Sequence, residues 1–231
     1  MHYDFKQKLN KIDSQQYRNL RIPEIDWKLN EAQELFVKMI AEPRLRNYLG
    51  FETSQRSIDD IRTVVVKDYC SSIVNNTATL PQNYWHFLSG YVTMDKGNCK
   101  GVKSNPINIR QHDDEFEVSP FDSSSFEWRE VNALFYEKGL KFYTDGTFTN
   151  KLFCMNYIKE LKYIHNAADF GAGSYRLPSG TLLTGSVSCE LPKGTHREIV
   201  DLAVAIASND LQNPDFQNKI QKLKFNNLLQ S

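Results

Sequence analysis

The sequence predicts a mixed α+β fold, in which an N-terminal helix pair and a C-terminal helix pack with an antiparallel β-sheet, either a sandwich or a small barrel. Three patterns lead to this prediction. Apolar residues have helical spacing before residue 64, short hairpin-linked strand patterns fill residues 64–190, and a capping sequence precedes an apolar run from residue 195. Strand and helix patterns do not alternate, so we do not expect a doubly wound parallel sheet.

The first helix is predicted from Ile25 onward, because five apolar residues share one helical face. Pro23 suits the first turn of this helix, and Pro43 is expected to end it. The five apolar residues are Ile25, Leu29, Ala32, Phe36 and Met39. A second helix is predicted from Ser54 to about Thr63, with apolar residues three and seven positions apart.

The β region is predicted from β-branched and aromatic runs that are separated by turn sequences. Asp95–Asn98, Glu137–Gly139 and Thr144–Thr147 are predicted as turns, the last two as tight hairpins. The predicted strands are residues 63–66, 84–88, 91–94, 132–136, 140–143 and 151–158, the last of which can extend to Leu161. Such a series favours an antiparallel sheet.

The closing helix is predicted from a capping box. Thr195 is expected to accept a hydrogen bond from the amide three residues on, and Glu198 to reach back to the Thr195 amide. Residues 199–207 are apolar nearly all round the helix, which means that most faces must be covered. Beyond Asn213-Pro214, a basic tail carries a short apolar stripe of Phe216, Ile220 and Leu223.

The chain is accordingly divided into three parts. Residues 1–21 form a polar N-terminal arm, either loosely ordered or docked on a neighbouring subunit. Residues 22–212 form a single domain, with a helical layer (22–63 and 195–212) and an antiparallel β region (64–190). Residues 213–231 form the basic tail helix.

Composition and cysteine spacing limit the functions to consider. The 28 basic and 28 acidic residues balance, which excludes a globally basic nucleic-acid binder. No apolar run reaches the ~18 residues of a membrane span, and the N-terminus lacks a signal-peptide pattern. The cysteines Cys70, Cys99, Cys154 and Cys189 contain no CxxC pair, so we expect reduced thiols, no metal and no cofactor.

Four motifs, in order along the chain, resemble those of structural proteins of tailed bacteriophages. The first two are "LN-x-AQ" at Leu29–Gln33 and "FE-x-x-Q" at Phe51–Gln55. The third is "LP-x-x-Y" at Leu80–Tyr84, and the last is "LP-x-x-x-H-x-E-I-V-D-L-A" at Leu191–Ala203. Over about Ile25 to Asp210, the chain resembles ring proteins between portal and tail, especially those of the crAss-like group.

This resemblance implies a non-enzymatic head–tail connector subunit of a short-tailed phage, located in the virion and assembled in the host bacterial cytoplasm. Its expected partners are further copies of itself in a closed ring of about twelve, the portal protein and neighbouring tail proteins. DNA is expected to pass through the ring without sequence-specific contacts, and no membrane is involved. For the assembly interface, we expect contacts from Phe216, Ile220 and Leu223.

Two other functions remain open at this point. A β-sandwich that binds carbohydrate would use Trp85 and Trp128 as stacking residues. A small hydrolase would place its site around His165, Asp169 and His196. The connector hypothesis predicts no hydrolytic activity, whereas the hydrolase predicts loss of activity on His196→Ala.

Overall fold

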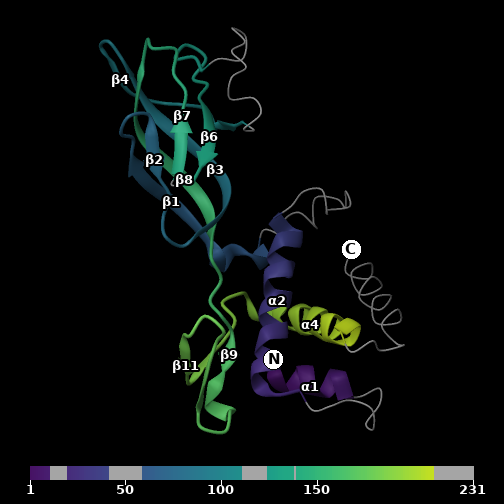
Figure 1. The fold of residues 1–231 in the computed structure, drawn as a ribbon. Helices are drawn as coiled ribbons and strands as arrows, with labels where there is room; N and C mark the ends of the chain where they lie inside the picture. Colours follow the sequence, from purple (N-terminus) through teal and green to yellow (C-terminus); the bar gives the residue numbers. More distant parts are fainter. Residues whose placement is uncertain (11–19, 42–58, 111–123, 138, 211–231) are drawn as a thin grey trace, which may run out of the picture. The chain divides into compact units, whose positions relative to one another are not determined.

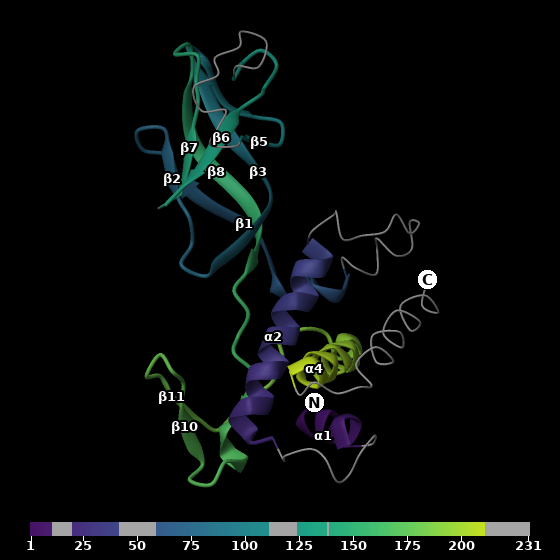
Figure 2. The same ribbon diagram turned by 45° about the vertical axis from the view of Figure 1, so that its right-hand side comes forward.

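The computed structural model describes residues 1–10, 20–41, 59–110, 124–137 and 139–210. The chain divides into two compact units (Figures 1 and 2). The helical unit comprises Met1–Val64 and Leu161–Ser231, and the sheet unit comprises Val65–Glu160. The mixed α+β class predicted from the sequence is confirmed. The boundaries predicted near residues 21 and 212 stay a prediction.

The helical unit is built around α2 (Ile22–Ala41), which packs against α4 (His196–Asp210). The predicted apolar stripe is largely confirmed, because Ile25, Leu29, Ala32 and Phe36 are buried. Met39, in the last turn of the helix, is instead 37% exposed. Apolar side chains of α4 complete this core: Ile199, Val200, Ala203, Val204 and Ala207.

The polar arm expected at the N-terminus begins with a packed helix, α1 (His2–Asn10). Phe5 and Leu9 are one helical turn apart and are buried, and α1 contacts α4. Lys8 forms an ion pair with Asp201 of α4. Residues 2–10 are therefore an ordered helix rather than a loose arm, because two apolar residues one turn apart cover part of α4. Docking of the arm on a neighbouring subunit stays a prediction.

The predicted second helix is only partly described. Residues 54–58 lie outside the described residues, and Asp59 and Asp60 are helical. A 3-10 turn, η2 (Arg62–Val64), follows. The predicted strand therefore begins two residues late, at Val65, because Val64 is buried in the helical unit.

Two small two-stranded sheets belong to the helical unit and follow residue 161. One joins β9 (His165–Asn166) to β12 (Ser186–Val187), and the other joins β10 (Ser174–Arg176) to β11 (Leu182–Thr184). The 3-10 turn η4 (Ala167–Asp169) leads out of β9. This region therefore places β9 against α2.

The first sheet of the sheet unit is antiparallel, with the strand order β1-β8-β3-β4. Its strands are β1 (Val65–Ser72), β8 (Thr149–Lys159), β3 (Tyr84–Lys96) and β4 (Cys99–Lys103). The two strands predicted at 84–88 and 91–94 are one strand, with a register irregularity between Phe87 and Ser89. The turn predicted before β4 is confirmed, with Gly97 at a positive φ of 55°.

The second sheet has the order β2-β7-β6-β5. Its strands are β2 (Thr77–Thr79), β7 (Gly139–Phe142), β6 (Asn132–Tyr136) and β5 (Asn108–Ile109), and only β5 pairs in parallel. The predicted β6–β7 hairpin is confirmed. Gly139 is required there, because a Cβ would lie 2.0 Å from the carbonyl oxygen of Ala78.

The hairpin predicted at Thr144–Thr147 is wrong. The Asp145 carboxylate does accept the Thr147 amide at 2.8 Å, which is a local turn. However, the segment links β7 in one sheet to β8 in the other. The local turn signal is real, but pairing depends on the partner strands.

One core of aromatic and aliphatic residues forms in this unit, including Val92, Leu140, Phe142, Phe153 and Met155.

Two of the four cysteines form a disulfide, so the prediction of reduced thiols is wrong for them. Cys70 of β1 and Cys154 of β8 lie directly opposite each other and are bonded. Strand register places them together, although 84 residues separate them in sequence. Cys99 and Cys189 are free, and burial raises the pKa of the Cys189 thiol.

The capping box predicted at the start of α4 is also corrected. The Thr195 amide donates to the carbonyl of Pro192 at 3.0 Å rather than to Glu198. The Thr195 hydroxyl donates to the same carbonyl at 2.9 Å. Residues 193–195 form a 3-10 turn, η5, and this turn uses the amide that the capping box requires.

Candidate functional site

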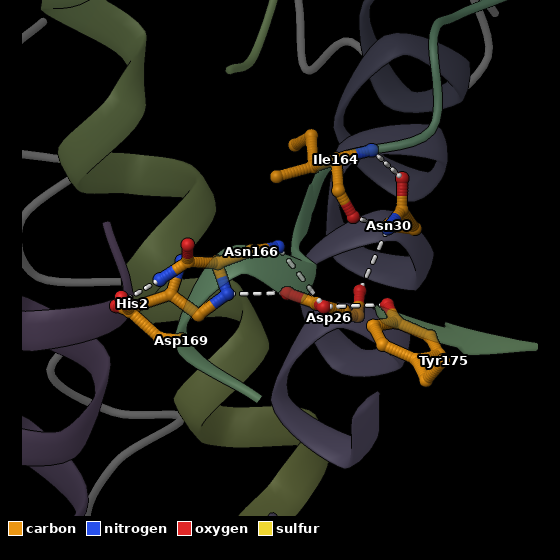
Figure 3. Close-up of polar contacts among 7 residues, drawn as sticks. All are labelled: His2, Asp26, Asn30, Ile164, Asn166, Asp169 and Tyr175. Atoms are coloured by element: carbon orange, nitrogen blue, oxygen red, sulfur yellow. Dashed lines mark hydrogen bonds and ion pairs between the residues drawn. The ribbon is translucent and has the colours of Figure 1, made fainter. Parts of the chain in front are cut away.

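A buried polar site of the helical unit surrounds Asp26, in the first turns of α2. Its side chain is 0% exposed, and a buried carboxylate needs hydrogen-bond partners to be tolerated. Asp26 accepts the Tyr175 hydroxyl at 2.5 Å and the Asn166 amide at 3.2 Å, and its other oxygen pairs with the His2 ring (Figure 3). This carboxylate thus joins α1, α2, β9 and β10.

One turn further along α2, Asn30 binds backbone rather than a side chain. Its Nδ2 donates to the carbonyl of Ile164 at 2.7 Å, and its Oδ1 accepts the Ile164 amide at 2.8 Å (Figure 3). The same Nδ2 also donates to the carbonyl of Asp26 at 2.7 Å. The side-chain amide therefore satisfies both backbone groups of one residue, as a neighbouring strand would.

Gln33 extends this clamp by another turn. Its Nε2 donates to the carbonyl of Lys162 at 3.2 Å, and its Oε1 accepts the thiol of Cys189 at 3.2 Å. Asp26, Asn30 and Gln33 therefore hold the segment before and within β9 against α2. We did not assign these roles from the sequence, although polar residues at i, i+4 and i+7 on a helix do share a face.

Two tyrosines beside Asp26 have raised pKa values. Burial is the main cause for Tyr175, and its hydrogen bond to Asp26 and the nearby negative charge raise the pKa further. Burial and the charge of Asp26 also raise the pKa of Tyr163, while its hydrogen bond to Tyr175 lowers it. Both phenols therefore remain protonated at neutral pH, and Tyr175 acts as a donor to Asp26.

A pocket of about 430 Å³ lies next to this network, and we call it the Trp27 pocket. Trp27 is 55% exposed on its wall. Its lining includes Pro23, Trp27, Lys28, Tyr163, Tyr175 and Arg176. The Arg176 guanidinium is positioned by a hydrogen bond to the carbonyl of Gly180, at 3.0 Å. An aromatic pocket of this kind suits a side chain that anchors a partner protein.

The hydrolase hypothesis placed His165, Asp169 and His196 in one site. In the structure, the carboxylate of Asp169 accepts the Asn166 side chain at 2.6 Å, and the His196 ring contacts the carbonyl of Leu191 at 2.9 Å. His165 is buried, and its Nδ1 has no hydrogen-bond partner among the described residues. Across the described ranges, no three His, Cys, Asp or Glu side chains are placed to hold a metal ion. No hydrogen bond links the three predicted residues to one another within the described part of the chain.

The carbohydrate hypothesis used Trp85 and Trp128 as stacking residues. Trp85 is the second residue of β3, where its ring packs on His86 with 4.6 Å between centroids. Trp128 is 76% exposed in a turn whose Glu127 pairs with Lys96, at the far end of β3. The strand from Trp85 to Lys96 spans roughly 35 Å at ~3.3 Å per residue. The two tryptophans are therefore too far apart to stack on the same sugar ring, and carbohydrate binding at either one stays a prediction.

The residues predicted for assembly, Phe216, Ile220 and Leu223, lie outside the described residues. Among the described helices, none is long and apolar enough to cross a membrane.

No protein-family model matches the chain, and no curated protein matches it either. The likeness to phage ring proteins therefore depends on the four sequence motifs. Asn30 and Gln33 of the first motif bind the segment that precedes β9. The second motif lies outside the described residues.

The third and fourth motifs also have defined structural roles. In the third, Asn83 Oδ1 accepts the Tyr157 hydroxyl at 2.9 Å, and its carbonyl accepts the Glu160 amide at 2.8 Å. In the fourth, the carbonyls of Leu191 and Pro192 accept His196 and Thr195 as the chain enters α4. Asn83 and Thr195 occupy positions that the motifs leave open, so His196 is the one motif-defining side chain among these contacts of the third and fourth motifs.

Proposed function

We propose that the chain is a virion structural protein that forms a ring in the head–tail connector or tail of a short-tailed bacteriophage. In this role it links the portal to the tail and lines the DNA passage. The observation that carries the proposal is the order of the four motifs along the chain, in which Asn30, Gln33 and His196 are motif-defining side chains that bind backbone carbonyls.

Exposed anchors on the subunit support ring assembly. A ring closed by head-to-tail contacts needs two different surfaces on each subunit. The Trp27 pocket offers one on the helical unit. On the sheet unit, Trp128 is 76% exposed and Tyr136 is 38% exposed. Exposed aromatic side chains of this kind are typical anchors of protein interfaces.

Charge and disulfide chemistry are compatible with this role. Equal numbers of acidic and basic residues give no strong overall attraction for phosphate, as suits a passage through which DNA moves. A disulfide such as Cys70–Cys154 persists outside the reducing cytoplasm, which is where a released virion resides.

The test is assembly on the portal of the same virus. The purified chain is incubated with portal rings and followed by negative-stain imaging and native mass spectrometry. We expect a ring of added density with a fixed number of chains per portal. If the chain binds neither the portal nor any tail protein of that virus, the proposal is wrong.

A matched pair of variants tests the Trp27 pocket as a contact. Trp27→Ala should weaken ring formation at least tenfold, since it removes an exposed aromatic anchor. Tyr3→Ala is the control, because Tyr3 is 73% exposed in the same unit and does not line the pocket. Equal loss of assembly in both variants would argue against a specific contact at Trp27.

A further inference from the structure

A second hollow lies on the face of the first sheet that is turned away from the core of the sheet unit. Along β3 and β8, Val92, Met94 and Phe153 are buried in that core. Side chains alternate along a strand, so Tyr91 and Cys154 project from the other face. There a trough of about 380 Å³ is lined by residues that include Asp68, Ser89, Tyr91, Lys103, Cys154 and Asn156. We call it the sheet trough.

The backbone around the sheet trough is held in a defined shape. The register of β1 shifts between Val66 and Tyr69, and Asp68 within this bulge has a positive φ of 54°. Its amide donates to the Oδ1 of Asn156 at 3.0 Å. The Cys70–Cys154 disulfide joins the same two strands covalently. Asp68, whose side chain is exposed, is thus held by the bulge in the lining of the trough.

The trough combines an aromatic ring with polar groups of both hydrogen-bonding types. The Tyr91 ring is half-buried, and the Lys103 ammonium lies 4.8 Å from its centroid. On the other wall, the Asn156 amide donates to the Ser89 hydroxyl at 3.3 Å. Ammonium, amide and hydroxyl groups can donate to a ligand, and the exposed Asp68 carboxylate can accept from one.

This arrangement selects among ligand classes. A purely apolar side chain would leave the polar rim without partners, which is unfavourable. A simple anion such as phosphate has no apolar face for Tyr91 and would leave the Asp68 carboxylate without a donor. A saccharide ring has an apolar C–H face for Tyr91, and its hydroxyls both donate and accept hydrogen bonds. The trough volume is within the ~300–1,000 Å³ range of small-molecule pockets.

We infer that the sheet trough binds a saccharide ring, stacked on Tyr91 and hydrogen-bonded by Asp68 and Asn156. The site is separate from the Trp85 and Trp128 pair considered above. Saccharide binding goes beyond the proposed ring function, because a single chain forms the whole trough. The Lys103 side chain is flexible and can turn from the ring to a sugar hydroxyl or a sugar carboxylate.

The experiment is a glycan array probed with the full chain, followed by saturation-transfer NMR and calorimetry on the saccharides it retains. Neutral and carboxylated saccharides form separate arms. Tyr91→Ala and Asp68→Asn should each weaken binding at least tenfold. Asp68→Asn preserves the side-chain size and suits the positive φ, so it tests the site even if Tyr91→Ala does not fold.

The control is Tyr136→Ala, which removes a 38% exposed aromatic ring of the same unit that does not line the trough. It should bind saccharide as the unchanged chain does. Lys103→Met should affect the carboxylated arm more than the neutral arm if the ammonium binds a carboxylate. The inference is overturned if the chain binds no saccharide, or if binding survives both trough variants. Neither result bears on ring assembly, which is measured separately with the portal.

Discussion

The Cys70–Cys154 disulfide should supply a large part of the stability of the sheet unit. It closes a loop with a sequence separation of 84 residues. The chain-entropy relation gives about 4.5 kcal/mol for a loop of this length, and measured disulfides usually contribute about 2–4 kcal/mol. Cys70→Ser removes the bond while leaving the buried Cys154 side chain in place. We therefore expect the free energy of unfolding of the sheet unit to fall by about 3 kcal/mol.

The measurement is thermal unfolding of the oxidised protein, followed by near-ultraviolet circular dichroism. For a unit of about 100 residues, 1 kcal/mol corresponds to roughly 4–8 °C, so Tm should fall by at least about 10 °C. Addition of a reductant to the unchanged protein should lower Tm by a similar amount. Cys99→Ser is the matched control, because Cys99 is exposed and free in the same unit, and its Tm should not change.

Two results would refute this reasoning. One is an oxidised protein whose Cys70 and Cys154 both react with a thiol reagent under native conditions. The other is a Cys70→Ser variant that unfolds at the same temperature as the oxidised chain. Either would mean that the strand register between β1 and β8 is maintained without the covalent bond.

Three further predictions concern the helical unit. Asp26→Asn should lower its free energy of unfolding by about 2–4 kcal/mol in urea titrations, because it removes a buried charge that binds His2 and Tyr175. Glu31→Gln, whose partner Lys28 lies at the surface of the helix, should change it by less than about 0.5 kcal/mol. Because the pKa of Tyr175 is raised in the folded state, its contribution is fully present below pH ~10 and is lost as pH rises further. Tyr175→Phe should therefore reduce the slope of stability against pH in that alkaline range, and an unchanged slope would contradict the assignment. Thr195→Ala should cost about 0.5–2 kcal/mol by removing the hydroxyl that donates to Pro192, and an unchanged Tm would show that this turn does not need it.

Strong local periodicity explains which elements could be predicted. α2 carries five apolar residues on one face, and four of them are buried as expected. The β6–β7 hairpin was recognisable because a glycine turn separates two short strand patterns. In both cases, the residues that predict the element are close together in the sequence, within one helix or one hairpin.

The missed features depend on residues that are distant in sequence. Helix α1 has only Phe5 and Leu9 as buried apolar residues, and its helical state depends on packing against α4. The disulfide depends on the β1–β8 register, which four scattered cysteines do not reveal. From the sequence, Asn30 was noted only as part of a motif. Its partner is the backbone of Ile164, and a contact to backbone produces no recognisable pattern of side chains in the sequence.

The way the chain enters and leaves the sheet unit has a consequence for engineering. The unit starts at Val65 and ends at Glu160, and Val65 pairs directly with Ile158 near that end. Its two ends are therefore neighbours, and a short loop could replace the whole unit at little entropic cost. The same geometry makes the excised segment a candidate for independent expression or transplantation into another host protein. Along the chain, the sheet unit is thus a removable cassette, which could be exchanged while the helices and their polar clamp remain unchanged.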